Sequence, residues 1–245
     1  MLGSFIDAQA WPVVLQQIAD WAVRRESRYV CICNVHSIVT ASRDAALGDV
    51  ISQADMATPD GAPVAWMLRK LGFAGQVRIN GPDLMWRFCA RAAESGQSMF
   101  LYGSAPKTLE LLQQRMRMQF PGVQIAGAYS PPFRALTAAE DEAVVEQINA
   151  SDAGVVWVSL GCPKQEQWIA AHRGHINAVM VGVGAAFDYH AGTIQRAPLW
   201  MQKAGLEWLY RLVTEPRRLW RRYLVTNTLF IWGATRQLAA RRLRG

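Results

Sequence analysis

The chain has 245 residues, of which 51% are hydrophobic and 18% charged, and its formal net charge is +7 at pH 7. This apolar content is enough for a sizeable core, in one large domain or two small ones. The mean hydropathy is near zero, and no uncharged apolar run reaches the roughly 20 residues that span a bilayer. These properties exclude an integral membrane protein and favour a soluble or peripheral one.

The N-terminal segment 1–11 contains the early acid Asp7, no basic leader and no long apolar stretch, which is not the pattern of a signal peptide. We therefore expect the protein to stay on the cytosolic side of the membrane. Cys31 and Cys33 alternate on a predicted strand and point to one face. No second Cys/His cluster accompanies them, so two small buried side chains are favoured over a metal or redox pair.

Strand-length apolar runs alternate with longer helical patterns along the chain. The predicted strands are nearly all apolar, as parallel strands covered on both faces should be, and they span 29–35, 98–102, 155–160 and 178–183. The predicted helices include 11–25, 106–119 and 137–149, the last capped by Thr137 with Glu140 three residues later. The alternation predicts an α/β fold, a Rossmann-like, doubly wound, mostly parallel sheet with helices on both faces.

Two acidic turns precede predicted helices in the first half of the chain. The turn 58–63 places Asp60 before a helix at 64–70, where it can cap the helix or act as a general base for a sugar hydroxyl. Asp83 precedes a helix at 84–93 and can serve as its cap. Arg78, between the two turns, can pair with a phosphate or with a surface acid.

Three glycine-containing loops follow predicted strands and should meet at the edge where open α/β sheets bind ligands. In the first, Gly103 and Ser104 can let backbone N–H groups approach a phosphate, or form an ordinary connection. Beyond Gly161, Gln165 can bind oxygens of a sugar or base, or lie at an exposed helix start. No Walker loop and no GxGxxG fingerprint is present.

The third loop, 182–190, sets small residues, including Gly184, before an acid, Asp188. Close backbone packing explains the glycines with or without a ligand. His190 in the same stretch is interpreted as structural or exposed, because no nucleophile is paired with it in the sequence.

The stretch 193–245 is strongly basic. It holds eleven Lys and Arg against two acids, Glu207 and Glu215, which makes it +9; because the whole chain is +7, residues 1–192 carry −2. Four of the ten tryptophans also lie there. Arginine mixed with tryptophan indicates a phosphate-rich, partly apolar partner, either a membrane interface or a nucleic acid.

Within this basic stretch, Thr214 is the predicted cap of a helix with Pro216 in its first turn. The helix carries two i,i+4 arginine pairs with apolar and aromatic side chains between them, a pattern that suits anionic headgroups. The alternative is a solvated basic helix packed on the body. The pairs are Arg217 with Arg221 and Arg218 with Arg222. A composition break near 196–198 predicts a boundary between an α/β domain at 1–195 and a basic helical appendage at 196–245.

Taken together, these stretches resemble the WecG/TagA/CpsF family of bacterial glycosyltransferases (glycosyltransferase family 26). The matches cover most of the chain in the family's order, and the last three are long and specific. They are TPDGAPVAW (58–66), RINGPDL (78–84), FLYGS (100–104), SLGCPKQEQW (159–168), GVGAAFDYHAGTIQRAP (182–198) and EWLYRLVTEPRRLWRRYL (207–224).

The resemblance implies an inverting transfer of a hexose from a UDP-sugar to a polyprenyl-diphosphate-linked sugar, with a β linkage, in exopolysaccharide or cell-envelope glycan assembly. It implies a peripheral protein on the cytoplasmic face of the inner membrane, with an anionic membrane surface as partner, no nucleic acid, no cofactor and no metal. The absence of a DxD motif agrees with the last point. Whether copies of the chain form a homo-oligomer is left open.

The resemblance also implies roles for individual residues. Asp60 is the expected base, and Asn34, Arg78 and Gln165 are the expected donor-binding positions. Arginines of the C-terminal appendage should close over the active site and touch the membrane; these are Arg211, Arg218 and Arg222. The expected substrate-binding set also takes in Asp83, Gly103, Ser104, Gly161, Gly184, Asp188 and Arg196. Three further arginines, Arg241, Arg242 and Arg244, are expected to hold only lipid.

The sequence departs from the family at one position. Family members often have Thr-x-Asn at the end of the first strand, and here that triplet is Ile32-Cys33-Asn34. With His36-Ser37, this favours the branch that transfers glucose in xanthan-type assembly, so UDP-glucose is the expected donor. N-acetylmannosamine or its uronate is the alternative within the family. From other classes, a nucleic-acid-binding module and a nucleotide-dependent oxidoreductase stay open.

Overall fold

The computed structural model describes residues 1–243, so Arg244 lies outside the described part. One six-stranded sheet organises the chain, with the strand order β2-β1-β6-β5-β3-β4, and every strand pair is parallel. The prediction of a doubly wound α/β fold is confirmed. The strands are β1 (Arg28–Cys33), β2 (Met56–Pro59), β3 (Ser98–Gly103), β4 (Gln124–Tyr129), β5 (Val155–Ser159) and β6 (Val179–Gly182).

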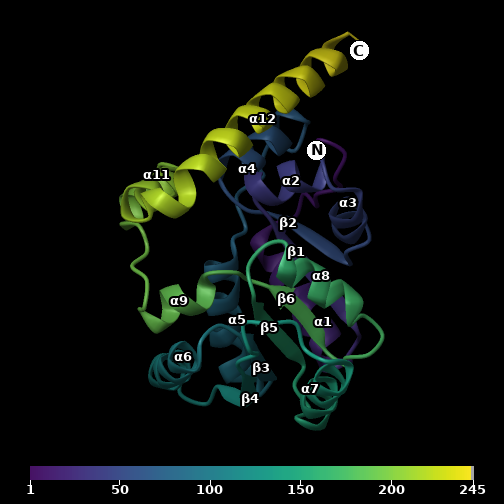
Figure 1. The fold of residues 1–245 in the computed structure, drawn as a ribbon, viewed down its shortest axis with the longest axis vertical. Helices are drawn as coiled ribbons and strands as arrows, with labels where there is room; N and C mark the ends of the chain where they lie inside the picture. The colour runs from purple at the N-terminus through teal and green to yellow at the C-terminus, as the bar shows by residue number, and fades with distance from the viewer. Residues whose placement is uncertain (244–245) are drawn as a thin grey trace.

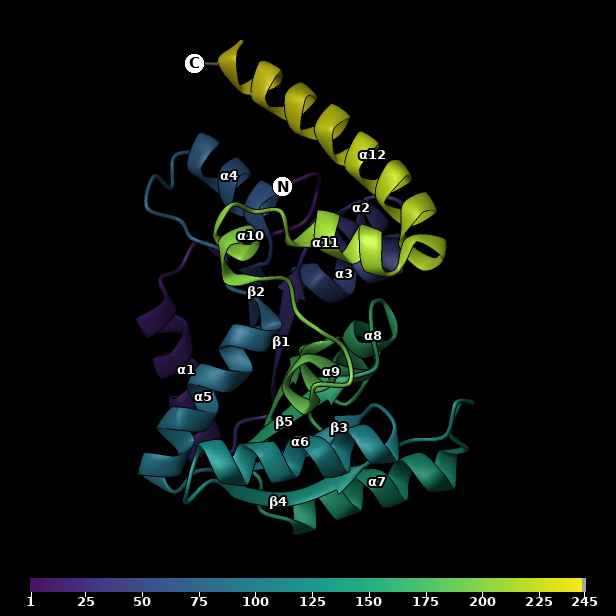
Figure 2. The same ribbon diagram turned by 90° about the vertical axis from the view of Figure 1, so that its left-hand side faces the viewer.

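Helices cover both faces of the sheet, and each face has its own apolar core. α1, α5, α6 and α9 pack on one face, while α2, α3, α4, α7 and α8 pack on the other, joined by part of α12. Figures 1 and 2 show the two layers and α12 (yellow), which runs past the body. The helices are α1 (Trp11–Val23), α2 (Val35–Ala41), α3 (Ala45–Ser52), α4 (Ala62–Lys70), α5 (Gly81–Ser95), α6 (Pro106–Gln119), α7 (Ala138–Ala150), α8 (Lys164–Ala171), α9 (Ala186–Ala191), α10 (Leu199–Lys203), α11 (Glu207–Thr214) and α12 (Pro216–Arg242).

The predicted elements are confirmed in place, but some boundaries differ. The first strand ends at Cys33 rather than at 35, because Asn34 caps α2 by accepting the backbone N–H of Ser37 through its side chain. α2, α3, β2 and β4 were not predicted from the sequence. β2 is only four residues long, and β4 is an edge strand whose residues alternate between exposed and half-buried at its start, so neither gives the continuous apolar run of a central strand.

The helix caps predicted from the sequence are confirmed only in part. Thr137 and Glu140 form the predicted reciprocal capping box of α7. The cap predicted at Asp83 is wrong, because Asn80 caps α5 and Asp83 lies inside its first turn. The cap predicted at Thr214 is also wrong: Thr214 ends α11, and its hydroxyl donates to carbonyl oxygens of the preceding turn.

The basic stretch forms α10, α11 and α12, and it packs on the body rather than standing apart from it. Phe230 and Ala234 of α12 are buried in the core of the second face, while α12 lies against α2. Among residues 1–243, no helix combines the length and the apolar character that a bilayer crossing requires.

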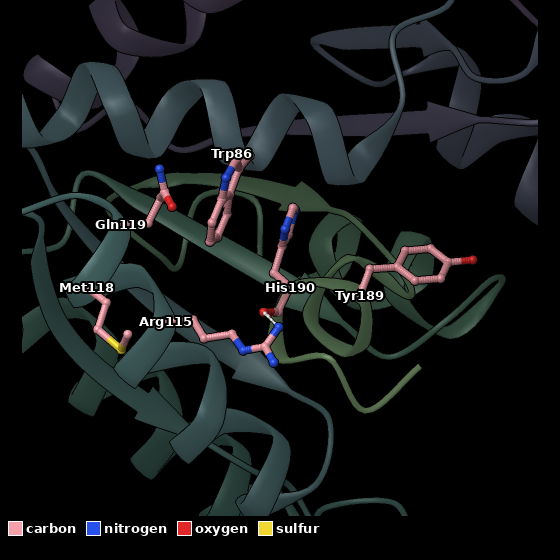
Figure 3. A pocket seen from close by; sticks show the side chains of 6 residues that line it. All are labelled: Trp86, Arg115, Met118, Gln119, Tyr189 and His190. Carbon is pink, nitrogen blue, oxygen red and sulfur yellow. Dashed lines mark hydrogen bonds between the residues drawn. The ribbon is translucent and has the colours of Figure 1, made fainter. Parts of the chain in front are cut away.

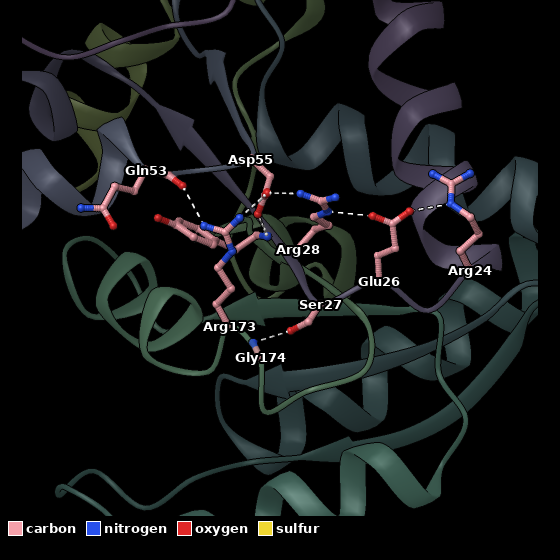
Figure 4. A network of polar contacts seen from close by, with 9 residues as sticks. Arg24, Glu26, Ser27, Arg28, Gln53, Asp55, Arg173 and Gly174 are labelled. Atoms are coloured by element: carbon pink, nitrogen blue, oxygen red, sulfur yellow. Dashed lines mark hydrogen bonds and ion pairs between the residues drawn. The ribbon is translucent and has the colours of Figure 1, made fainter.

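The amino-terminal edge of the sheet is closed by a buried carboxylate, shown in Figure 4. The side chain of Asp55 is 5% exposed and accepts hydrogen bonds from Arg28 and Arg173, each at 2.8 Å, and from the backbone N–H of Tyr29 at 3.0 Å. These contacts join the start of β1, the segment before β2 and the loop after α8. This edge is therefore tied up by structural contacts, and the opposite edge carries the loops that can meet a ligand.

Candidate active site

The carboxyl ends of β1 and β2 bring Asp60 and Asn34 together. The backbone N–H of Asp60 donates to the carbonyl oxygen of Cys33 at 2.9 Å, so the residue after β2 lies beside the end of β1. Asp60 does not cap α4: the cap position is Gly61, at φ 88°, and no side chain caps this helix. The carboxylate of Asp60 also joins none of the ion pairs formed within residues 1–243, which leaves it available for proton transfer.

The surroundings of Asp60 suit a general base. Its pKa is raised from 3.8 to about 7, chiefly by burial and further by the carboxylates of Glu207 and Asp83, against the opposing effect of Arg78 and Arg196. A base is most effective when its pKa lies near the working pH. The carboxylate therefore combines an unpaired state with a pKa matched to neutral solution.

Arg78 and Arg196 lie in one ion-pair network beside this carboxylate. Arg78 pairs with Glu207 of α11 at 2.9 Å, and Arg196 pairs with the same carboxylate at 3.3 Å. Arg196 also reaches Asp83 at 2.5 Å, and Asp83 accepts from the side-chain amide of Asn80 at 2.7 Å. The structure therefore brings Arg78, Asp83 and Arg196 together, as expected of residues of one site.

Gln165 lies between two of the predicted ligand loops. Its side-chain oxygen accepts the backbone N–H groups of Gly161 at 3.2 Å and Gly184 at 2.9 Å, and its amide nitrogen donates to Glu166 at 3.0 Å. The residue is 4% exposed. Its observed contacts fix the loops after β5 and β6 relative to each other, and direct contact with a donor stays a prediction.

The loop after β3 is held against the loop after β5 by backbone contacts. Gly103 has φ 111°, and a Cβ there would lie 2.4 Å from the carbonyl oxygen of Ser159, so the close approach requires glycine. The backbone N–H of Ser104 donates to the same oxygen at 3.0 Å. The hydroxyl of Ser159 donates to the carbonyl of Gly184 at 2.7 Å, so the three predicted loops form one connected edge.

Asp188 lies in the first turn of α9, beyond β6. Its carboxylate accepts the Thr193 hydroxyl at 3.0 Å, and its backbone carbonyl accepts the N–H groups of Thr193 and Ile194. These contacts anchor the segment that leads to Arg196. A role of Asp188 in donor binding stays a prediction.

The three appendage arginines differ in how they are paired. Arg218 pairs with Glu215 at 2.5 Å, and Arg211 reaches the same carboxylate at 3.7 Å. Arg222 forms no ion pair within residues 1–243, and its buried Nε has no hydrogen-bond partner there. The pKa of Cys162 is raised to about 12, chiefly by burial, against an opposing effect of the Arg222 charge, so Arg222 lies near the loop after β5.

Two residues of this region were missed in the sequence. Glu207 was treated only as one of two acids in a basic tail, although it opens the last stretch that resembles the family. Glu166 is 1% exposed, and its Oε2 has no hydrogen-bond partner among the described residues; burial raises its pKa. The sequence feature that could have identified Glu166 is its position next to Gln165 in the stretch 159–168.

Two hollows adjoin the site on the side of α9. One, of about 470 Å³, contains Arg196 and Tyr210, and it shares Arg115 and Tyr189 with its neighbour. The neighbour, of about 360 Å³, is shown in Figure 3 and is lined by Trp86, Arg115, Met118, Gln119, Tyr189 and His190. In it the imidazole of His190 stacks on Trp86 at 4.0 Å and contacts the Pro82 carbonyl at 2.8 Å, contacts that fit a structural role, one of the two interpretations made from the sequence.

The cysteines and acids give no sign of a metal centre in the described chain. Cys31 and Cys33 are buried and free, as the interpretation of two small apolar side chains requires. Over residues 1–243, no three side chains of the His, Cys, Asp and Glu types gather in a metal-binding group.

The sequence of this chain matches a known protein family and a named relative. The profile of the "Glycosyl transferase WecG/TagA/CpsF family" matches residues 1–244. A protein of Bacillus spizizenii (strain ATCC 23059 / NRRL B-14472 / W23) is 32% identical over 222 residues, which are 90% of this chain and 84% of that protein. That protein is named N-acetylglucosaminyldiphosphoundecaprenol N-acetyl-beta-D-mannosaminyltransferase.

Proposed function

Because this chain belongs to the WecG/TagA/CpsF family of glycosyl transferases, we propose that it moves a sugar from a UDP-sugar to a polyprenyl-diphosphate-linked sugar. The observation that carries the proposal is the unpaired carboxylate of Asp60 beside the two guanidinium groups of Arg78 and Arg196. A transferase that inverts the sugar needs such a base for the acceptor hydroxyl and cations for the departing diphosphate. Membership of this family also favours an enzyme over the nucleic-acid-binding and oxidoreductase alternatives.

In the proposed reaction Asp60 takes the proton of the acceptor hydroxyl as that oxygen attacks the sugar. The bond between the sugar and the diphosphate breaks, and UDP leaves. Arginine can bind phosphate oxygens through two parallel hydrogen bonds. Arg78, in the ion-pair network with Glu207, and Arg222, whose Nε has no partner within residues 1–243, are the proposed diphosphate ligands.

For the sugar, the comparison favours the N-acetylmannosaminyl alternative over glucose, because the Bacillus relative is named as an N-acetylmannosaminyltransferase. One feature keeps glucose as a second candidate. At the position where the family often has threonine, Ile32 is 6% exposed and packs in the core between the sheet and α1 and α5. Ile32 lies beside Thr58 on β2, and we propose that the missing hydroxyl alters the preference for the donor sugar.

The surface of the C-terminal helices supports docking on a membrane from the cytoplasmic face. The exposed side of α12 carries Arg217 and Arg221 in its first turns, followed by a line of large apolar side chains that are 43–63% exposed: Trp220, Leu224, Val225, Ile231 and Trp232. Basic residues next to interfacial aromatics bind anionic lipid headgroups. We propose that this face holds the protein at the inner membrane as a peripheral enzyme.

A donor screen tests the proposal. The purified protein is incubated with UDP-N-acetylmannosamine, its uronate or UDP-glucose, in parallel, and with polyprenyl-diphosphate-linked N-acetylglucosamine or glucose as acceptor. We expect transfer to be fastest from UDP-N-acetylmannosamine and to be stimulated by anionic vesicles. Transfer from none of the donors would overturn the proposal, and transfer from UDP-glucose alone would select the second candidate.

Membrane docking is tested separately by vesicle sedimentation. The double variant Ile231→Ser/Trp232→Ser should bind phosphatidylglycerol vesicles about tenfold more weakly, because burying apolar side chains at the interface contributes to binding. Met118→Ser removes a similarly exposed apolar side chain from α6 and should leave vesicle binding unchanged. Equal effects of the two variants would contradict docking through α12.

A further inference from the structure

Glu207 is the one acid of the basic stretch that reaches the predicted catalytic body. The stretch 193–245 has two acids, and the other, Glu215, pairs with Arg211 and Arg218 inside the stretch itself. Glu207 opens α11, yet its partners are Arg78, from the segment between α4 and α5, and Arg196. A carboxylate with this reach links the C-terminal helices to the site.

The two oxygens of Glu207 are divided between the two guanidinium groups. Oε2 lies 2.9 Å from Arg78 Nη1, and Oε1 lies 3.3 Å from Arg196 Nε. About a fifth of each of the three side chains is exposed, so water screens these pairs less than it screens a surface pair. Within residues 1–243, Arg78 makes no other hydrogen bond, whereas Asp83 and Asn80 also hold Arg196.

The bridge lies beside the reacting carboxylate. Four charged groups act on Asp60: Glu207 and Asp83 disfavour its ionised form, and Arg78 and Arg196 favour it. Glu207 therefore acts on Asp60 directly by its charge, and indirectly because it fixes where the guanidinium of Arg78 stands. Both effects depend on α11 being docked, since Glu207 enters the site only with that helix.

We propose that Glu207 is a positioning residue of the transfer reaction: by bridging Arg78 and Arg196, it couples docking of the C-terminal helices to the arrangement of charges around Asp60. This inference rests on the proposed function, because it assigns Glu207 a part in that same site. With α11 released, Asp60 loses a neighbouring negative charge and becomes a weaker base, and Arg78 loses the partner that fixes it. The site is then assembled only when the appendage lies on the body.

The decisive variant is Glu207→Gln, which keeps the shape of the side chain and removes its charge. We expect kcat/KM above pH 8 to fall about tenfold, because an Arg78 guanidinium that Glu207 no longer holds orients the substrate less precisely. The acid limb of the pH profile should also move to lower pH. Glu215→Gln removes the other negative charge of the stretch and is the matched control, because Glu215 pairs with Arg211 and Arg218 and is not among the charges that act on Asp60; its acid limb should stay in place.

A second variant separates the effect of the negative charge of Glu207 from the effect of its side-chain length. Glu207→Asp keeps the negative charge but is one methylene shorter and cannot span both arginines. It should keep the acid limb near its original pH while kcat/KM falls. If Glu207→Gln fails to fold, this variant still tests the bridge; unchanged kcat/KM in Glu207→Asp would overturn the positioning role.

A direct titration makes the failure of this inference distinguishable from the failure of the proposed function. The side-chain carbon signal of Asp60, assigned with Asp60→Asn, is followed by 13C NMR against pH in the wild type, Glu207→Gln and Glu215→Gln. We expect its midpoint to fall only in Glu207→Gln. An unmoved midpoint in an active enzyme overturns the role of Glu207, whereas a moved midpoint in a protein without any transfer activity overturns only the proposed function.

Discussion

The backbone N–H of Asp60 donates a hydrogen bond to the carbonyl oxygen of Cys33 at a distance of 2.9 Å. This contact places the residue that follows β2 against the residue that ends β1, so Asp60 and Asn34 emerge side by side at the carboxyl edge of the sheet. Ile79 continues the arrangement, because its N–H donates to the Pro59 carbonyl at 2.8 Å. Backbone pairing therefore sets the course of the chain at Asp60 and next to Arg78, and side-chain contacts then fix the Arg78 guanidinium.

Asp60→Asn should abolish transfer and preserve donor binding. The amide keeps the size of the carboxylate but cannot accept the proton of the acceptor hydroxyl, and loss of a general base typically costs 10²–10⁴-fold in rate, so we expect a loss of about 10³-fold. Radiolabelled transfer gives the rate, and calorimetry gives the affinity for UDP. Near-normal turnover in this variant would rule out Asp60 as the base.

The raised pKa of Asp60 also predicts how stability depends on pH. The folded pKa of about 7 exceeds the value of 3.8 expected for the unfolded chain, so the folded state holds the proton more tightly. The stability that this proton contributes is present below pH 3.8 and is lost as the pH rises to about 7. Asp60→Asn should therefore raise Tm relative to the wild type at pH 8 and not at pH 4, as measured by calorimetry.

Arg222→Gln should weaken UDP binding without lowering stability. The Nε of Arg222 is buried and has no hydrogen-bond partner within residues 1–243. Removing the guanidinium therefore leaves no buried acceptor without its donor. A hydrogen bond to a charged group contributes about 1.5–3 kcal/mol, and we expect Kd for UDP to rise at least tenfold. Arg218→Gln is the control, since Arg218 is 61% exposed and pairs with Glu215; an equal effect of both variants would assign the result to net charge.

Gly103→Ala should destabilise the fold more than Gly96→Ala. Both glycines have positive φ, 111° and 71°, but a Cβ on Gly103 would lie 2.4 Å from a backbone oxygen, whereas one on Gly96 would lie 3.8 Å from the end of the Gln124 side chain. The conformational cost alone is about 1–2 kcal/mol, which we expect for Gly96→Ala. Urea unfolding should give a clearly larger loss for Gly103→Ala, and equal losses would contradict the close approach of the loops after β3 and β5.

Asp55→Asn tests the closed amino-terminal edge of Figure 4. The substitution removes the charge that accepts from Arg28 and Arg173, although Arg28 keeps its pair with Glu26. A hydrogen bond to a charged group contributes about 1.5–3 kcal/mol, and we expect a loss in this range. Asp152→Asn removes a carboxylate that also pairs with an arginine, Arg25, but is 79% exposed; it should cost at most about 1 kcal/mol. Urea unfolding compares the two, and similar losses would show that burial of Asp55 is not what makes its contacts strong.

The pattern of the sequence was sufficient for the fold class and for the central strands. β1, β3, β5 and β6 are nearly all buried, and continuous apolar runs report such burial on both faces. The same signal fails for β4, whose edge position leaves alternate residues open to solvent. Residue type also fails to identify two helix starts. Asp83 and Thr214 are residue types that commonly cap helices, but Asn80 occupies the cap position of α5 and Glu215 that of α12.

By itself the sequence determined the alternation of strands and helices, the loops that gather at one edge of the sheet, and the charge imbalance between residues 1–192 and the basic stretch. Those properties follow from the order of residues along the chain. The tertiary structure alone decided that Glu207, 129 positions from Arg78, divides its oxygens between Arg78 and Arg196, and that Arg222 faces the body while Arg211 and Arg218 turn to Glu215. Such pairings depend on how α11 and α12 pack on the sheet, and charge along a chain carries no information about which opposite charge a fold will bring within 3 Å.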